Sequence, residues 1–471
     1  MIASSATPLL TLPEVARMAG GDLMARSVPG EAAAREAWLR SGIDGASIDT
    51  RTLEPGDLFV PLPGAHADGH AFLGEAFRLG AAAALCARER YAGLEGREPG
   101  PLIVVDDVTA ALMQLGRRHR EGWRGLMLCV TGSTGKTTTK DLVAAVLGTS
   151  APTLKTEGNL NNHWGVPLTL LRLRPGHGAA VVELGTSHAG EIAQLAAIAL
   201  PGAALITNAG SAHLEGLGSL EAIAREKAAL GFALRAGEPL FAGADSPRLI
   251  AALAGVQARL VTFGLAPGAA VRPRRVEDLG PEGSRIEVEG FPPVHLRLVG
   301  THQVLNALGA LAVAREFRLD PQGVADAIGA HRPSRGRMEV QHARGATLLV
   351  DCYNANPEST AAAIETLERW PGASRRIAVL GDMLELGGSA ATLHRQTTAH
   401  VRTSELWVVG AHAADFAAGA RGASTPPREF DGLEPLAAAL AGSLAPGVVV
   451  LLKASRGVRL ERVLEGLDLE T

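Results

Sequence analysis

Residues 126–140 read Leu-Met-Leu-Cys-Val-Thr-Gly-Ser-Thr-Gly-Lys-Thr-Thr-Thr-Lys, an apolar run followed by a glycine-rich turn and a helix-forming segment. Glycines let backbone N–H groups turn inward around phosphates, and the N-terminus of the next helix adds a favourable dipole. Lys136 is placed to neutralise β- and γ-phosphate oxygens, and Thr137 to ligate Mg²⁺. The segment therefore predicts a loop that binds ATP or GTP, formed by Gly132, Ser133, Thr134, Gly135, Lys136, Thr137 and Thr138.

This loop departs from the strict pattern of phosphate-binding loops, because Val130 occupies the position of the first glycine. Gly132 supplies an early glycine instead, which gives the shorter form G-x-x-G-K-T. A chance glycine turn is the alternative interpretation. We prefer the phosphate loop because strand, turn, lysine, threonine and helix occur together in the order that the chemistry requires.

Apolar strands alternate with helical stretches on both sides of the loop, as in parallel α/β sheets. After the loop we expect strands at Ala179–Leu184, Ala204–Thr207 and Leu240–Ala242. Antiparallel strands are expected within 272–299, and one long helix follows at Gln303–Phe317. A second open sheet is expected from Thr347–Val350, Ile377–Leu380, Leu406–Val409 and Val448–Leu452. Before the loop, the Ala-rich stretch Phe72–Ala87 is expected to be helical, between strands Leu58–Val60 and Leu102–Val105.

The length of 471 residues exceeds what one hydrophobic core usually organises, so two or three domains are expected. The pattern changes near Val108 and again at 331–336. We predict an α/β protein of three domains: a small α/β domain at 1–108, a central phosphate-loop domain with a parallel sheet at 109–331, and a C-terminal Rossmann-like α/β domain at 332–471.

The composition is that of an ordinary globular protein, with 46% hydrophobic residues, 20% charged residues and a formal net charge of -4. This charge gives no reason to expect a nucleic-acid partner. Three widely separated cysteines without metal-ligand spacing favour reduced thiols. No basic segment followed by an apolar core begins the chain, and no apolar run is long enough to span a membrane, so we expect a cytoplasmic protein without a membrane span.

Lysine is rare in this chain, and its few positions are informative. Of 45 basic residues, only five are lysines: Lys136, Lys140, Lys155, Lys227 and Lys453. Where arginine serves the generic surface positions, a remaining lysine more often needs a compact ammonium or a titratable amine. Codon bias with chance survivors is the alternative.

Two further residues lie where parallel sheets bind ligands. The strand ending at Glu183 puts a carboxylate at the carboxyl edge, and the next strand leads to His213 at the same edge. Lys227 follows on a predicted helix. Taken alone, His213 is more typical of a structural histidine and Lys227 of a surface lysine.

The three residues together give a more specific interpretation. A strand-borne Glu183, then Asn208-x-x-x-x-His213-Leu-Glu, then Ala-Arg-x-Lys227 resembles the central domain of the Mur ligases. The resemblance implies that CO₂ carbamylates Lys227, and that two Mg²⁺ ions bridge the transferred phosphoryl group. Thr137 and Glu183 would hold one ion, and His213 and carbamylated Lys227 the other. It also implies that Lys136, His213 and Lys227 are the catalytic residues.

The resemblance extends over nearly the whole chain. Thr50 and Arg51 lie in motifs similar to the family's UDP-binding domain, with Arg51 near the diphosphate. By the same likeness Asn162 lies near the γ-phosphate, Asn306 and Arg337 contact adenine and phosphate, and Asp351 binds the ribose. The substrate residues that it implies in the third domain are Asn354, Asn356, Lys453 and Arg456.

The resemblance implies a reaction. ATP phosphorylates the terminal carboxylate of a UDP-N-acetylmuramoyl-tripeptide, and the amine of D-Ala-D-Ala attacks the acyl phosphate, in peptidoglycan precursor synthesis. A monomer with large domain movements is expected. Four positions depart from the family pattern: Ser187, Ser211, Val350 and Ala454.

Two alternatives stay open at this stage. Another amide ligase of the superfamily, acting on folate or on a different muramoyl substrate, would share the central domain. A nucleotide switch or transport ATPase would explain the phosphate loop but not the combination of His213 and Lys227.

Overall fold

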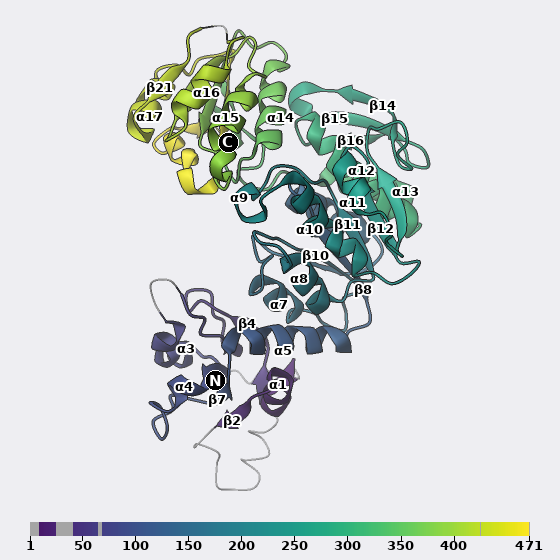
Figure 1. Ribbon diagram of the computed structural model, residues 1–471, viewed down its shortest axis with the longest axis vertical. Coiled ribbons are helices and arrows are strands. Elements are labelled where there is room, and N and C mark those ends of the chain that lie inside the picture. The colour runs from purple at the N-terminus through teal and green to yellow at the C-terminus, as the bar shows by residue number, and fades with distance from the viewer. Residues whose placement is uncertain (1–8, 25–40, 65–67, 424, 471) are drawn as a thin grey trace. The chain divides into compact units, whose positions relative to one another are not determined.

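The computed structural model describes residues 9–24, 41–64, 68–423 and 425–470 (Figure 1). The described residues form two compact units, which we treat separately. The first unit lies within Met1–Cys129, Pro152–Leu184 and Ala193–Pro201, and the second comprises Val130–Ala151, Gly185–Ile192 and Gly202–Thr471.

A five-stranded sheet organises the first unit, in the order β2-β7-β6-β5-β4. Its strands are β2 (Asp22–Met24), β4 (Gly45–Ser47), β5 (Asp57–Phe59), β6 (Ala83–Ala87) and β7 (Leu102–Val105), parallel except for β2 against β7. Helices α1 (Leu12–Ala19) and α5 (Val108–Gly122) cover one core cluster, and α3 (Leu73–Arg78) contributes to another. The same unit contains the parallel pair β9 (Thr153–Lys155) and β10 (Ala179–Glu183), and helix α7 (Gly165–Leu170).

The prediction of a helix over Phe72–Ala87 is wrong for the second half of that stretch. Helix α3 ends at Arg78, and every residue of the alanine-rich run Ala83–Ala87 is buried in strand β6. Gly80 has φ +104°, which a helix does not allow, and a Cβ there would meet Pro55 at 3.1 Å. A fully buried apolar run has no polar face, so its periodicity does not distinguish helix from strand.

The second unit begins with the end of β8 (Leu126–Thr131), which leads into α6 (Lys136–Leu147). Strands β11 (Ala203–Ile206), β12 (Pro239–Gly243) and β13 (Arg259–Phe263) pair in parallel. A separate antiparallel sheet, β14-β15-β16 (Pro273–Asp278, Ser284–Val288, Val294–Leu296), then precedes helix α12 (Thr301–Glu316). The antiparallel strands predicted within 272–299 and the long helix after them are confirmed.

A seven-stranded sheet forms the C-terminal part, in the order β21-β20-β19-β22-β18-β17-β23. The four predicted strands are β18 (Ala346–Asp351), β19 (Arg375–Gly381), β20 (Glu405–Val409) and β22 (Val448–Lys453), which pair in parallel with one another. At the sides are β17 (Glu339–Ala343), β21 (Arg428–Phe430) and β23 (Leu469–Glu470). Helices α14 (Pro357–Glu368), α15 (Ala390–Thr398), α16 (Ala413–Gly419) and α17 (Leu433–Ala441) pack around it (Figure 1).

Neighbouring residues of these strands belong to different cores. Leu349 packs with Ile364 and Phe416, whereas Leu348 and Val350 pack with Leu436 on the other face. Because successive side chains of a strand point to opposite faces, both faces of the sheet are buried under helices. The carboxyl ends of the strands therefore remain as the edge where a ligand reaches the sheet.

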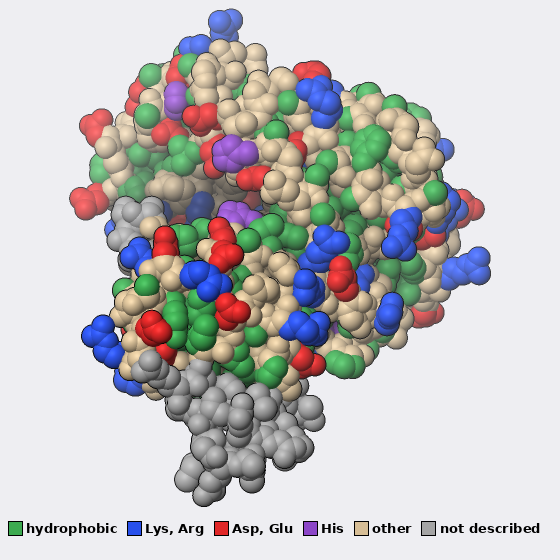
Figure 2. Space-filling view, turned by 60° about the horizontal axis from the view of Figure 1, so that its bottom comes forward, with side chains coloured by type: hydrophobic (Ala, Val, Ile, Leu, Met, Phe, Trp, Pro, Cys, Tyr) green, Lys and Arg blue, Asp and Glu red, His purple; other side chains and the backbone are tan. Residues whose placement is uncertain are grey.

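Among the described residues, no helix has the length and apolar character needed to cross a membrane. Basic and acidic side chains are interspersed on the described part of the face shown in Figure 2, so that face has mixed charge.

Candidate functional site

The phosphate loop joins β8 to α6, and its two glycines have backbone angles that favour glycine. Gly132 has φ +148° and Gly135, the N-cap of α6, has φ +76°. A Cβ would lie 1.9 Å from Thr207 Oγ1 at Gly132 and 2.2 Å from Asn306 Oδ1 at Gly135. A larger residue at either glycine would have to displace these side chains and adopt an unfavourable backbone angle, which explains why the turn contains glycines there.

Neighbouring strands hold this loop in place. Thr134 N–H donates to Asn208 Oδ1 at 3.0 Å, and Thr207 Oγ1 donates to the Thr134 carbonyl at 2.6 Å. Gly210 N–H donates to Ser133 Oγ at 2.9 Å. The residues after β11 therefore fix the loop at its tip, a role that the sequence did not reveal.

The ammonium of Lys136 folds back over the loop. Its Nζ donates to the carbonyls of Gly132 at 2.8 Å and Ser133 at 3.4 Å. Thr137 and Thr138 lie in the first turn of α6, and Thr137 Oγ1 accepts a hydrogen bond from Arg337 Nη2 at 2.9 Å. Arg337 also lies over the Tyr353 ring, 3.9 Å from its centroid. The structure thus brings together Thr137 and Arg337, which are far apart in the sequence.

The change Gly135→Ala is expected to weaken nucleotide binding by about tenfold or more, because the new methyl group would displace Asn306 and a left-handed backbone angle would be imposed on alanine. Calorimetric titration with ADP measures the change. The control is Gly122→Ala at the exposed end of α5, where a Cβ meets nothing within 4 Å; equal affinities of the two variants would contradict the expectation.

Asn306 lies on α12 beside the loop. Its Oδ1 accepts a hydrogen bond from Thr139 Oγ1 at 3.1 Å, and its Nδ2 donates to Gln303 Oε1 at 2.8 Å. The side chain is buried, so these bonds fix it against the start of α6. The structure therefore places Asn306 directly beside Gly135 of the phosphate loop.

His213 and Lys227 occupy consecutive helices of the second unit. His213 is the N-cap of α9 (Leu214–Leu217) with φ +59°, and its Nδ1 contacts a carboxylate oxygen of Glu385. The polar contact with His213 lowers the pKa of Glu385 and so favours its charged form. Lys227 lies on α10 (Leu220–Phe232) with 0% of its surface exposed, so it is not the surface lysine of the alternative interpretation.

The preceding residue, Glu226, is also buried. Its carboxylate accepts hydrogen bonds from the N–H groups of Gly190 at 2.7 Å and Ile192 at 2.8 Å. It thereby ties the helix of Lys227 to the segment that follows β10. No motif in the sequence marks Glu226 for this role.

Glu183 ends β10 in the first unit, and 2% of its surface is exposed. Asn161 Nδ2 donates to Glu183 Oε1 at 2.9 Å, a contact that was not predicted. The predicted Asn162 instead accepts from the N–H groups of Trp164 and Gly165, at 3.1 and 2.9 Å. The described residues contain no group of three or more His, Cys, Asp and Glu side chains arranged for a metal ion.

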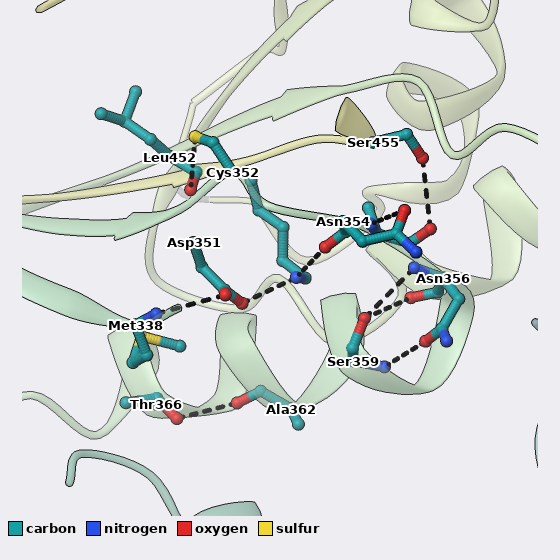
Figure 3. Close-up of polar contacts among 12 residues, drawn as sticks. Met338, Asp351, Cys352, Asn354, Asn356, Ser359, Ala362, Thr366, Leu452 and Ser455 are labelled. Carbon is teal, nitrogen blue, oxygen red and sulfur yellow. Dashed lines mark hydrogen bonds and ion pairs between the residues drawn. The ribbon is translucent and has the colours of Figure 1, made fainter. Parts of the chain in front are cut away.

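A buried ion pair lies at the carboxyl ends of β18 and β22, between Asp351, which Figure 3 labels, and Lys453. Lys453 Nζ donates to Asp351 Oδ2 at 2.7 Å and to the Asn354 carbonyl at 2.9 Å. Met338 N–H donates to Asp351 Oδ1 at 3.2 Å. Only 1% of Lys453 is exposed, so its ammonium supports Asp351 and does not face an open substrate surface.

The other residues predicted to contact substrate lie at different places. Asn356 is buried and caps α14 by accepting from Ser359 N–H at 2.9 Å, and Asn354 Oδ1 accepts from Ala355 N–H at 2.9 Å. Arg456 pairs with Glu461 at 3.1 Å. In the first unit Thr50 adjoins Arg51, whose side chain is 86% exposed and pairs with Asp49.

Three family models match the chain: "Mur ligase family, catalytic domain" over residues 42–120, "Mur ligase middle domain" over 130–314, and "Mur ligase, glutamate ligase domain" over 336–456. The UDP-N-acetylmuramoyl-tripeptide--D-alanyl-D-alanine ligase of Bacillus subtilis (strain 168) is 34% identical over 464 residues, which cover 97% of this chain and 98% of that protein. The chain belongs to the Mur ligase family. The resemblance and the enzyme class, a ligase, are therefore confirmed.

Solved structures agree with this assignment. A crystal structure of MurF from Acinetobacter baumannii has a TM-score of 0.84 to this Mur ligase at 28% identity, over 97% of this chain and 98% of that chain. MurF ligase from Thermotoga maritima in complex with ADP has a TM-score of 0.78 at 30% identity, over 89% and 96%. The predicted α/β fold with three domains is confirmed.

Proposed function

We propose that this Mur ligase is an ATP-dependent enzyme that joins D-Ala-D-Ala to UDP-N-acetylmuramoyl-tripeptide in peptidoglycan precursor synthesis. The observation that carries the proposal is the similarity to UDP-N-acetylmuramoyl-tripeptide--D-alanyl-D-alanine ligases. The match covers 98% of the Bacillus subtilis protein, and the Escherichia coli (strain K12) protein is 36% identical over 75% of this chain and 78% of that protein. A likeness that includes the first and third domains bears on the substrates as well as on nucleotide use.

The reaction needs two transfers. An oxygen of the tripeptide's terminal carboxylate attacks the γ-phosphorus of ATP, and ADP leaves. The amine of D-Ala-D-Ala then attacks the acyl carbon, inorganic phosphate leaves, and the amine proton is lost to solvent or a base. Phosphoryl transfer depends mainly on positioning and charge neutralisation, so no covalent bond to a protein side chain is required.

The phosphate loop and the residues around it provide the nucleotide site in this proposal. Lys136 would exchange its contacts with loop carbonyls for phosphate oxygens, and Arg337 would exchange Thr137 Oγ1 for a phosphate. Asn306 would contact the adenine, and Asp351 would accept hydrogen bonds from the ribose hydroxyls. Each residue is held by a neighbour that fixes its direction, which lowers the entropy lost on binding.

Two Mg²⁺ ions and a carbamylated Lys227 are part of the proposal. Thr137 and Glu183 would hold one ion, and His213 and the carbamate the other; the ions would neutralise charge on the transferred phosphoryl group. The ligand atoms fit a cation. The Thr137 hydroxyl oxygen already accepts a hydrogen bond from the Arg337 guanidinium, which is positively charged. Glu385 contacts Nδ1 of His213, so Nε2 remains as the ligand atom. Lys227 supplies an amine that CO₂ converts to an oxygen ligand.

The remaining expectations are proposals of the same kind. Thr50 and Arg51 would bind the UDP diphosphate, and Asn354, Asn356 and Arg456 would border the dipeptide region, with Lys453 acting through Asp351. The domains would divide near residues 108 and 331. We place the enzyme in the cytoplasm, as a monomer.

A coupled assay of phosphate release tests the function. Purified protein, ATP, Mg²⁺ and D-Ala-D-Ala are combined with the tripeptide nucleotide ending either in lysine or in diaminopimelate, and the product is identified by mass. Phosphate release should require both the UDP-linked tripeptide and D-Ala-D-Ala. Phosphate release from ATP alone would favour a nucleotide switch or transport ATPase.

The folate alternative has weaker support. Folylpolyglutamate synthase from Mycobacterium tuberculosis, complexed with ADP, is 18% identical to this chain at a TM-score of 0.61, which shows the fold alone. If product formed with a folate and glutamate, and none formed with the muramoyl tripeptide, the proposed reaction would be wrong and the folate reaction would be supported.

A further inference from the structure

Two carboxylates of the C-terminal part hold the residues that carry His213, a segment we name the His213 loop (210–215). Glu358, in the first turn of α14, accepts from Ser211 N–H at 2.8 Å and Ser211 Oγ at 2.7 Å. Glu385, in the segment after β19, contacts the ring of His213. The backbone carbonyl of Glu385 also accepts a hydrogen bond from Glu215 N–H at 3.0 Å. Both ends of the loop and its imidazole are therefore fixed.

The opposite side of the His213 loop contacts the phosphate loop. Gly210 N–H donates to Ser133 Oγ, and Ser133 Oγ donates to the Gly210 carbonyl at 3.0 Å. Because one short segment touches both the phosphate loop and the C-terminal part, a shift at Glu358 or Glu385 would reach the phosphate loop through Gly210 and Ser133.

The backbone of the His213 loop needs this support. His213 has φ +59°, a left-handed angle that is costly for a residue with a Cβ and persists where the surroundings determine it. At Gly210 a Cβ would lie 2.8 Å from the Glu358 carboxylate carbon, so the loop is shaped to admit that side chain. Gly387, two residues after Glu385, lies close to the other end of the loop, since a Cβ there would make ordinary van der Waals contact with Glu215, 3.4 Å from its Cα.

We propose that Glu358 and Glu385 are positioning residues, which hold the His213 loop so that the imidazole faces the metal only while the C-terminal part is docked. The inference rests on the proposed function in one respect, that His213 is a metal ligand. A carboxylate on the second ring nitrogen of a metal-binding histidine fixes the ring direction and its tautomer. Here that carboxylate comes from the C-terminal part, so docking and metal binding favour each other.

The test compares Glu358→Ala and Glu385→Ala with Glu365→Ala. Glu365 lies on the same helix as Glu358 and pairs with His400 at 3.2 Å, so it is a matched carboxylate without contact to the loop. Mn²⁺ binding in the presence of ADP is followed by electron paramagnetic resonance, and hydrogen exchange reports the amides of residues 211–215. We expect about tenfold weaker Mn²⁺ binding and faster exchange in the first two variants, and unchanged values in the third.

Equal Mn²⁺ affinity and equal exchange in all three variants would overturn the inference, even if ligase activity fell. So would a loss of the same size in the Glu365 variant. Ser211→Ala removes the hydroxyl partner of Glu358 from the other side and replaces the Glu358 variant if that protein does not fold. Neither readout needs the muramoyl substrate, so a wild-type protein without ligase activity would defeat the proposed function and leave this test intact.

Discussion

Replacement of Lys227 by alanine is expected to lower the ligase rate by a factor of about 100 or more, the usual cost of losing one group that stabilises charge in the transition state. The side chain is fully buried on α10, where a carbamate would replace an ammonium with a carboxylate-like oxygen ligand. Rates with both substrates at saturation measure the loss. Added formate or acetate should restore part of the rate by supplying the missing oxygen ligand.

The control for Lys227 is Lys227→Arg. Arginine keeps a positive charge but does not add CO₂ at neutral pH, because its guanidinium stays protonated. If the lysine acts as a carbamate, the arginine variant should be as inactive as the alanine variant. A fully active arginine variant would refute the carbamate role.

The second large effect concerns Lys453. Changing it to methionine is expected to lower the free energy of unfolding of the C-terminal part by about 3 kcal/mol, because removal of one partner leaves a mostly buried charge unpaired. Lys453 is 1% exposed and Asp351 16% exposed, so little solvent replaces the lost contact. Urea titration, followed by hydrogen exchange of the amides in β18 and β22, measures the change.

A second substitution separates charge from packing at this pair. Asp351→Asn combined with Lys453→Met removes both charges at similar volume, and we expect it to restore more than half of the lost stability. Affinity for ADP should stay low in the double variant, because the carboxylate for the ribose is gone. A single variant with nearly wild-type stability would contradict the assignment of Lys453 to Asp351.

Local patterns predicted those parts of the fold in which neighbouring residues carry the signal. The strand, glycines and lysine of 126–140 predicted the phosphate loop, and the alternating segments after residue 346 predicted the parallel strands β18, β19, β20 and β22. The prediction of a helix at Ala83–Ala87 was wrong, because burial on all sides removes the periodic signal that separates helix from strand.

Of the candidate site, the sequence named the chemical groups but not their partners. It singled out Lys453 by the scarcity of lysine, yet not its ion pair with Asp351, which lies 102 positions earlier in the chain. Nothing local marks Glu358 as the partner of Ser211, because the two are 147 positions apart.

By itself the sequence determined the α/β class through short-range periodicity and the family through the resemblance of its motifs, and it named the residues that we propose bind phosphate and metal. Only the tertiary structure decided that Lys227 is buried, that Glu226 and Asn161 support the neighbouring segments, and that Glu358 and Glu385 hold the loop of His213. The physical reason is that such contacts form when packing of the sheets and helices brings together strand ends and loops that are distant in the chain.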